Sequence, residues 1–110
     1  MKLPGGDKAV IDDGKLVDYC LSTTHPRGRH KARMFTAATG ITLAQAGLLR
    51  DALEAAAREE DALPTRSSEF GQIYEIRFPL TGPTGTAEIL SVWIVSPDDD
   101  RPRLVTCYPV

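Results

Sequence analysis

The hydrophobic period of the chain changes near residue 65, and this change constrains the fold more than any other feature. Before it, apolar residues recur at helical spacing, as at Leu49 and Leu53. After it, apolar and polar residues alternate, as around Ile76 and Phe78. The first spacing is typical of helices and the second of strands. The sequence therefore predicts an α+β domain, with helices in about residues 13–62 and a sheet in about residues 70–109.

Three helices are expected in the first half. An aspartate at position 12 or 13 can cap a helix over about residues 15–21. A second helix covers about residues 27–39 and ends at the glycine that follows. The segment Thr42-Leu-Ala-Gln45 has the spacing of a capping box, so a third helix is expected from there to about residue 61.

The second half is expected to form an antiparallel sheet. Strands are expected at residues 72–78, 86–96 and 103–108, and residues 65–68 are expected to be a linker. The segment 86–96 is apolar on both faces, which predicts a central strand. Short connections favour antiparallel neighbours. We therefore expect N-terminal helices packed on a C-terminal antiparallel sheet of three to four strands.

The composition excludes several classes of protein. The 110 residues are enough for one domain, 1–110, and carry a formal net charge of −2. No apolar run approaches the roughly 20 residues that a membrane-spanning helix needs. The first residues also lack the apolar core of a secretion signal. We therefore expect a cytoplasmic protein without a membrane partner.

Cys20 and Cys107 are the only cysteines, and each has apolar neighbours. Neither belongs to a Cys-x-x-Cys pair, and the two cysteines and two histidines do not have zinc-finger spacing. The sequence favours two buried free thiols over a disulfide. It predicts no metal site.

The segment 22–35 gathers most of the chemically active side chains. It holds both histidines, and four of the thirteen Lys and Arg residues lie within its seven consecutive positions 27–33. These residues are His25, Arg27, Arg29, His30, Lys31 and Arg33. A cluster of positive charge in an acidic protein creates a local field that attracts anions. The alternative is that the cluster is only the solvated face of a surface helix.

An RNA phosphodiester is an anion that these residue types suit. Cleavage without a metal needs a base for the 2′-hydroxyl, an acid for the leaving oxygen and cations for the phosphate. His25 and His30 are the candidate base and acid, since imidazole exchanges protons near neutral pH. The candidate cations are Lys31 in catalysis and Arg27, Arg29 and Arg33 in substrate binding.

Two residues of the last predicted strand complete the candidate site. The hydroxyl of Thr106 can bind phosphate, and Tyr108 can bind phosphate or stack on a base. Each assignment has a structural alternative. His25, which precedes Pro26, can simply cap a helix. Thr106 can be a small packing residue, and Tyr108 can belong to the core.

Several motifs occur together over nearly the whole chain. They are Lys-Leu-Pro near the start, His25-Pro-x-Gly28 followed by Lys31-Ala-x-x-Phe35, Leu80-Thr-Gly-Pro-Thr-Gly85, Trp93-Ile-Val, and Pro102-Arg-Leu-Val-Thr-Cys-Tyr108. Together they resemble a small bacterial domain family of unknown function. The cationic Gly-x-x-Lys-Ala helix and the final Thr-x-Tyr strand are also similar to the barnase–EndoU–colicin–RelE ribonuclease superfamily.

The second resemblance implies a toxin domain that cleaves RNA without a metal or another cofactor. Members of that superfamily act beside an antitoxin or at the end of long polymorphic toxins. The resemblance carries over His25, Lys31, Thr106 and Tyr108 as catalytic positions. It also implies RNA as substrate and a small acidic neutralising protein, encoded nearby, as partner. DNA is not expected as a partner.

Two other functions are compatible with the same residues. The chain can be a non-enzymatic module whose basic helix docks an acidic partner, or an inactive relative of a nuclease that only binds RNA. Geometry distinguishes these possibilities. An enzyme requires a histidine of the segment, Lys31 and a residue of the last strand to converge in one cleft, whereas a docking surface spreads them over a flat face.

Overall fold

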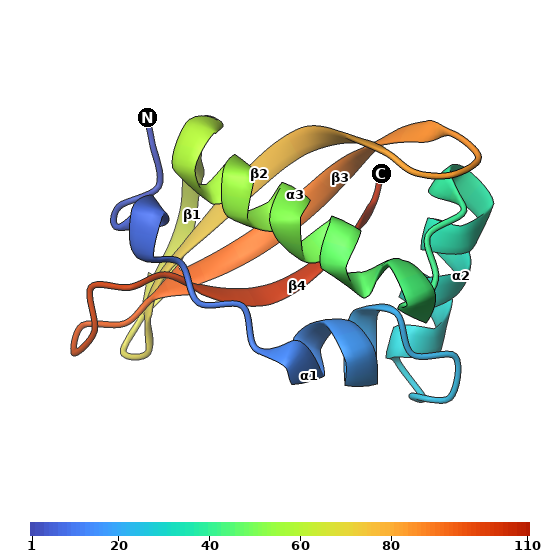
Figure 1. Ribbon diagram of the computed structural model, residues 1–110. Helices are drawn as coiled ribbons and strands as arrows, with labels where there is room; N and C mark the ends of the chain where they lie inside the picture. Colours follow the sequence, from blue (N-terminus) through green and yellow to red (C-terminus); the bar gives the residue numbers. More distant parts are fainter.

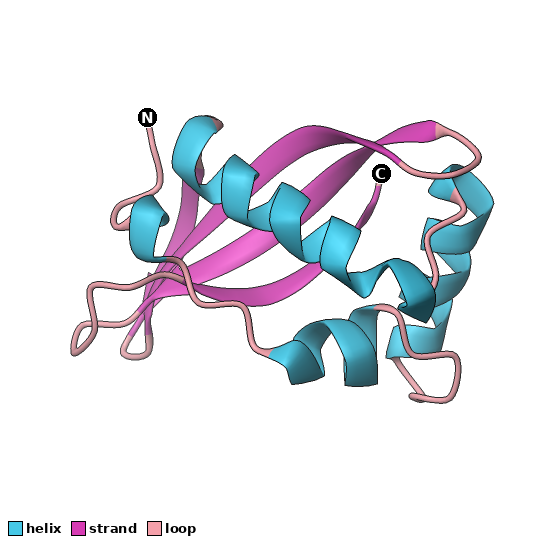
Figure 2. Ribbon diagram, in the orientation of Figure 1, coloured by secondary structure: helices cyan, strands magenta, loops and turns pink.

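The change of hydrophobic period divides the molecule into a helical half and a sheet half (Figures 1 and 2). The computed structural model describes all residues, 1–110. The helical elements are η1 (Gly6–Lys8), α1 (Asp13–Lys15), η2 (Leu16–Cys20), α2 (Gly28–Thr39), η3 (Leu43–Gln45) and α3 (Ala46–Glu59). The strands are β1 (Leu63–Ser68), β2 (Gly71–Thr81), β3 (Thr86–Val95) and β4 (Arg103–Pro109). The predicted α+β class, with helices first and strands second, is confirmed.

The sheet is an antiparallel meander in the order β1-β2-β3-β4. β3 lies between β2 and β4, so the strand predicted to be central is central. Helix α3 lies over one face of the sheet, and α2 stands near the turn between β2 and β3 (Figure 1). The amide of Thr84 in that turn donates to the carbonyl of Thr39 at 3.0 Å, which fixes the end of α2 to the sheet.

Strand β1 corrects the prediction of a linker at residues 65–68. All six side chains of β1 are exposed, and the strand is joined to β2 through its backbone. Its register shifts between Pro64 and Ser67, where the pairing is irregular. Sequence patterns detect strands through the apolar residues that they bury. A strand that buries none has no such pattern.

The first predicted helix begins two residues earlier than expected and is wound differently. One α-helical turn, α1, continues directly into η2, a five-residue π-helix. The expected aspartate cap is absent, because neither Asp12 nor Asp13 bonds the helix start with its side chain. Asp13 instead pairs with Arg50 of α3, and Asp12 lies 3.7 Å from Arg103 of β4. The two carboxylates therefore join α1 to its neighbours.

The ends of the two longer helices agree with the prediction. Gly40 follows α2 with a left-handed backbone at φ 78°, a conformation that glycine adopts at little cost. The capping box before α3 is also formed. Thr42 accepts the amide of Ala44 at 3.3 Å, and the Gln45 side chain accepts the amide of Thr42 at 2.9 Å.

The N-terminal segment is tied to the edge of β4. The amide of Val10 donates to Pro102 at 2.8 Å, and the amide of Leu104 donates back to Val10 at 3.0 Å. This short parallel bridge delivers the chain to α1, next to β4 (Figure 1). None of the helices combines the length and apolarity required to cross a bilayer.

The core lies between the helices and the inward face of the sheet. Ile89, Ser91 and Trp93 of β3 are fully buried there, together with Phe35 of α2 and Leu53 of α3. The buried indole N–H of Trp93 donates to the Ser91 hydroxyl at 2.9 Å. The hydroxyl donates in turn to the carbonyl of Ile76 at 2.9 Å. A buried polar group needs such a partner, and here one serine satisfies the indole.

The Ser91 relay predicts a specific loss of stability. Ser91→Ala leaves the buried indole N–H of Trp93 without an acceptor, so we expect the free energy of unfolding to fall by about 1–3 kcal/mol. Urea denaturation followed by tryptophan fluorescence measures the loss. Ser67→Ala on exposed β1 is the matched control, with an expected change within about 0.5 kcal/mol. Equal urea midpoints for the two variants would contradict the relay.

Candidate functional site

The loop between η2 and α2 folds back so that Tyr19 meets His25. The Ser22 hydroxyl accepts the amides of Thr24 at 3.3 Å and His25 at 3.1 Å, which tightens the loop. The rings of Tyr19 and His25 then pack edge to face, with centroids 4.9 Å apart and an interplanar angle of 87°. Tyr19 lies on a π-helix, a geometry that is frequent at functional sites.

Lys31 of α2 is the centre of the candidate site. Its ammonium donates to the Tyr19 hydroxyl at 3.0 Å and lies 4.9 Å from the centroid of the Tyr19 ring. It also lies 5.6 Å from the centroid of the Tyr108 ring of β4. Both partners are neutral, and no carboxylate pairs with Lys31. The ammonium is therefore held in place while its charge stays available to an anion.

His25 has a defined orientation because its ring binds the backbone at the start of α2. Its Nδ1 accepts the amides of Arg27 at 3.0 Å and Gly28 at 2.9 Å. An imidazole nitrogen that accepts hydrogen bonds carries no proton, so the proton of the neutral ring is on Nε2. His25 therefore does cap the start of α2, as its position before Pro26 suggested. The ring also presents an N–H donor at its other nitrogen.

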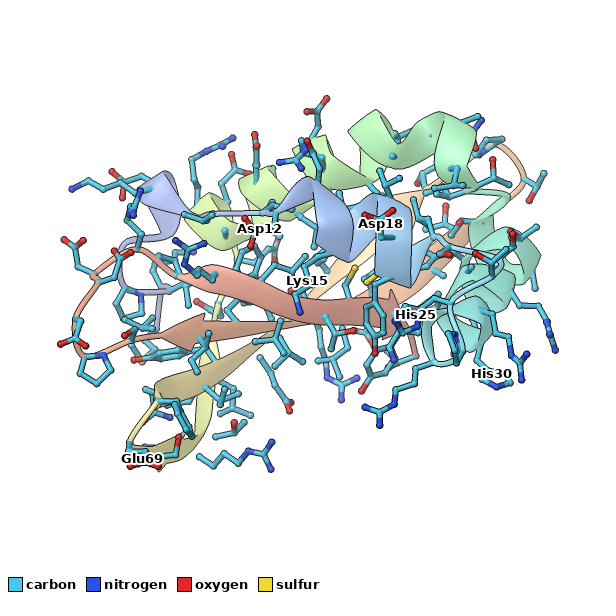
Figure 3. The ribbon with its side chains drawn as sticks, turned by 90° about the horizontal axis from the view of Figure 1, so that it is seen from below. Asp12, Lys15, Asp18, His25, His30 and Glu69 are labelled. Atoms are coloured by element: carbon cyan, nitrogen blue, oxygen red, sulfur yellow. The ribbon has the colours of Figure 1, made fainter.

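A cleft of about 640 Å³ opens beside these residues. It is lined by α1, η2, the following loop and β4, through Asp12, Gly14, Lys15, Asp18, Tyr19, His25, Arg27, Val105 and Thr106. Figure 3 shows Asp12, Lys15, Asp18 and His25 along this side of the molecule. Asp12 pairs with Arg103, whereas Asp18 makes no ion pair. The cleft thus contains cations, hydroxyls and one unpaired carboxylate.

The structure brings together five of the eight residues proposed from the sequence. His25, Arg27 and Thr106 line the cleft. Beside it, Lys31 donates a hydrogen bond to Tyr19 and lies over the ring of Tyr108. The Thr106 hydroxyl lies 3.9 Å from the sulfur of Cys20. These five residues come from the loop, α2 and β4, which are distant in sequence.

The other three proposed residues lie outside the cleft. His30 is exposed on the outer side of α2, away from His25 (Figure 3). Arg29 and Arg33 line a separate hollow of about 230 Å³, with Thr23, Ala32 and Thr36. Helix α2 contains no acidic residue, and none of its cations forms an ion pair. The basic segment therefore has two faces, one in the cleft and one outside it.

Tyr19 is the main residue that the sequence reasoning missed. The sequence spaces Tyr19 with Leu16 and Cys20 as residues of one apolar helix face are spaced, yet only Leu16 and Cys20 are fully buried. Half-buried Tyr19 instead bonds Lys31, twelve residues away. Lys15 and Asp18 of the cleft were also missed. No local pattern distinguishes these residues from ordinary helix positions.

No three His, Cys, Asp or Glu side chains are grouped so that they could hold a metal ion. Cys20 and Cys107 are both buried and free, which agrees with the thiol prediction. Their position next to Thr106 places them directly behind the cleft.

Comparison with protein families identifies the kind of domain. A family model described as domain of unknown function (DUF6883) matches residues 2–110. The chain belongs to this family. The resemblance to a domain family of unknown function is thereby confirmed, while the link to ribonuclease toxins stays a prediction. Searches of curated proteins and of solved structures found no match to this DUF6883 domain.

The contact between α2 and η2 can be tested at Gly28. A Cβ atom at position 28 would lie 2.0 Å from the carbonyl oxygen of Tyr19, so Gly28→Ala must push the two elements apart. We expect a loss of roughly 1–3 kcal/mol in the free energy of unfolding, as for overpacked positions. Thermal or urea unfolding measures it.

Gly47→Ala is the matched control for this substitution. It also lies in a helix, and its Cβ would meet no atom within 4 Å. It is expected to stabilise the protein by up to about 1 kcal/mol, because alanine favours the helix more than glycine does. A Gly28→Ala protein as stable as the wild type would show that α2 and η2 are further apart.

Proposed function

We propose that this DUF6883 domain is a metal-independent, ribonuclease-like toxin domain that cleaves RNA by attack of the 2′-hydroxyl and leaves a cyclic phosphate. The observation that carries the proposal is the setting of Lys31. An ammonium without a carboxylate partner is held between two tyrosines, beside a cleft that also contains His25, Arg27 and Thr106. Such convergence suits catalysis better than a flat docking face does.

The cations and donors of the cleft would stabilise the charge that grows on the phosphate. Lys31 would contribute a localised positive charge, and Arg27 would contribute a fork of N–H donors to phosphate oxygens. His25 would donate from Nε2, because its Nδ1 is bonded to the start of α2. Donors that are fixed before the reaction need no reorganisation when charge develops.

Proton transfer would fall to Tyr19 and Asp18 rather than to the histidines. The Tyr19 oxygen accepts from Lys31, so its own O–H is free to donate to the leaving oxygen of the RNA. Asp18 is the cleft carboxylate without an ion pair, and an ionised carboxylate can take the proton of the 2′-hydroxyl. The Thr106 hydroxyl would orient the phosphate from the opposite wall, and Tyr108 would hold Lys31 in place.

The outer face of α2 favours a second candidate function, the docking of an acidic partner. Arg29 and Arg33 lie one turn apart around their own hollow, and like charges at this spacing repel until an anion neutralises them. A small acidic neutralising protein would fit this face. RNA phosphates that flank the scissile bond would fit it as well. Measurement of RNA binding at several salt concentrations distinguishes the two ligands.

The catalytic proposal predicts toxicity that depends on the cleft. Expression of the domain alone in bacteria should arrest growth, and Tyr19→Phe or Lys31→Ala should relieve the arrest. Loss of an acid–base group lowers rates by about 10² to 10⁴-fold. In vitro, wild-type protein should cut single-stranded RNA in the presence of a chelator and leave cyclic phosphate ends, detected by mass spectrometry.

Tyr74→Phe is the matched control for Tyr19→Phe. Tyr74 lies on β2, opposite Trp93 and outside the cleft, so its hydroxyl should not affect cleavage. All variants should keep the wild-type melting temperature within a few degrees. Folded wild-type protein that neither arrests growth nor cuts RNA would refute the catalytic proposal. The docking of an acidic partner would then be the remaining candidate function.

The outer face of α2 can be tested by charge reversal. Arg29→Glu with Arg33→Glu should weaken binding of an uncleavable 2′-deoxy oligonucleotide. If both arginines contact phosphates, the slope of log affinity against log salt should fall by roughly 1.4, which corresponds to two contacts with a single strand. Fluorescence anisotropy at several salt concentrations measures this slope.

Arg58→Glu with Arg66→Glu is the control of equal net charge. Both residues are exposed and make no ion pair. This control should lower the affinity less and leave the slope unchanged. Equal slopes for both double variants would remove the outer face of α2 from the RNA-binding surface and favour its use by a protein partner.

A further inference from the structure

The two cysteines of the chain meet in the core. The sulfur atoms of Cys20 and Cys107 lie 3.8 Å apart, although 87 residues separate them in sequence. Both side chains are fully buried, one on η2 and the other on β4. Their neighbours in the chain are residues of the candidate site, because Tyr19 precedes Cys20, and Thr106 and Tyr108 flank Cys107.

We propose that Cys20 and Cys107 form a reversible disulfide when a peroxide reaches the protein, and that this bond distorts the cleft and switches it off. The loss of activity rests on the proposed ribonuclease function. The bond and the distortion do not depend on it.

Cys20 is the thiol prepared to react first. The Cys107 thiol donates a hydrogen bond to the Cys20 sulfur, and this bond is the main reason that the pKa of Cys20 is lowered to about 7. Burial raises this pKa, while Thr106 and Lys31 also lower it. The same hydrogen bond, together with burial, raises the pKa of Cys107. Cys20 is therefore the thiol that ionises first and supplies the nucleophilic thiolate, while Cys107 keeps its proton until it attacks the oxidised Cys20.

A small oxidant has a short path to the pair. The Thr106 hydroxyl contacts the Cys20 sulfur at 3.9 Å, and Thr106 and Tyr19 both line the open cleft. One layer of side chains thus separates the thiolate from solvent. A peroxide can pass such a layer during local opening, whereas a bulky disulfide reagent cannot reach the pair so easily.

The reaction proceeds in two balanced steps. The Cys20 thiolate attacks one oxygen of hydrogen peroxide, the O–O bond breaks, and the other oxygen takes up a proton and leaves as water. The Cys107 sulfur then attacks the sulfur of the resulting sulfenic acid. The S–S bond forms, and the departing hydroxide takes the Cys107 thiol proton and becomes a second water. The two sulfur atoms lose two electrons, which reduce the peroxide.

We expect formation of the bond to move the walls of the cleft. Bonded sulfur atoms are separated by about 2.05 Å, so the present distance of 3.8 Å has to shrink. The change pulls η2 towards β4 and shifts Tyr19 relative to Thr106 and Tyr108. Lys31 depends on both tyrosines for its position. A displacement of about 1 Å in a catalytic arrangement can cost roughly 10²-fold in rate.

The first experiment tests the bond. Purified, folded protein is treated with hydrogen peroxide and analysed by intact mass and non-reducing peptide mapping. We expect the loss of two hydrogen atoms, a Cys20–Cys107 cross-link in the monomer, and full reversal by dithiothreitol. The rate should rise with pH through about 7, where the Cys20 thiolate forms. The melting temperature should rise by roughly 10 °C, since the bond closes a long loop.

Cys20→Ala and Cys107→Ala are the control variants, each compared with wild type by circular dichroism and melting. Cys107→Ala should lose the cross-link, and sulfenic acid at Cys20, trapped by dimedone, should form more slowly than the wild-type cross-link, because the hydrogen bond that lowers the Cys20 pKa is gone. Cys20→Ala should react far more slowly. Intermolecular dimers, over-oxidation to sulfinic acid without a cross-link, or unreactive thiols in the folded wild type would overturn the proposal of a disulfide.

The second experiment tests the effect on the cleft without using activity. The two histidines provide an internal comparison, because His25 packs on Tyr19 while His30 is exposed outside the cleft. In NMR spectra of the imidazole groups, oxidation should shift the His25 signals and leave those of His30 unchanged. Unchanged His25 signals in the cross-linked protein would overturn the distortion of the cleft.

The third experiment tests the switch. RNA cleavage by the cross-linked protein should fall by roughly 10- to 100-fold and recover on reduction, whereas Cys107→Ala should keep its activity after peroxide. Full activity of the cross-linked protein would overturn the switch. Wild-type protein without any cleavage would refute the ribonuclease function and the switch with it, while the mass and NMR results would decide the bond and the distortion.

Discussion

Burial of the inward face of strand β3 is the interaction on which the rest of the structure depends. Ile89, Ser91 and Trp93 are fully buried, and both α2 and α3 contribute core residues to the same cluster. The helices are therefore positioned relative to the sheet. The catalytic proposal requires this, because its residues are divided between α2, η2 and β4. A change in the packing of β3 would alter the distance from Lys31 to Tyr108.

The features that the sequence predicted are those with a local physical cause. The glycine after α2 and the capping box before α3 are decided by a few neighbouring residues, and both are formed as expected. The central strand was evident because it is apolar on both faces. Strand β1 was not, because its pairing uses the backbone alone. The π-helix was missed for a related reason, since its apolar spacing is close to that of an α-helix.

In the candidate site as well, residues with a local sequence signal were predicted and residues that depend on distant contacts were not. The dense basic segment pointed to Lys31 and His25, and the last strand supplied Thr106 and Tyr108, which the fold places around one cleft. The helical spacing of the buried residues Ala32 and Phe35 is enough to place Arg29 and Arg33 on the outer face of α2. Tyr19 required knowledge of a contact across twelve residues. Sequence reasoning thus found the basic residues of segment 22–35, but it missed Lys15, Asp18 and the tyrosine hydroxyl that binds Lys31.

Strand β1 also has a consequence for the evolution of the molecule. Its side chains contribute nothing to the core, and the tip that joins it to β2 carries Phe70 with 71% of its surface exposed. Selection for folding therefore places few demands on the identity of these residues, as long as the backbone can pair. Closely related domains are free to diverge here without losing stability. The β1–β2 hairpin is accordingly the place where members of one family can acquire different recognition properties on an unchanged scaffold, and where an epitope or a fluorescent label can be inserted with the least disturbance.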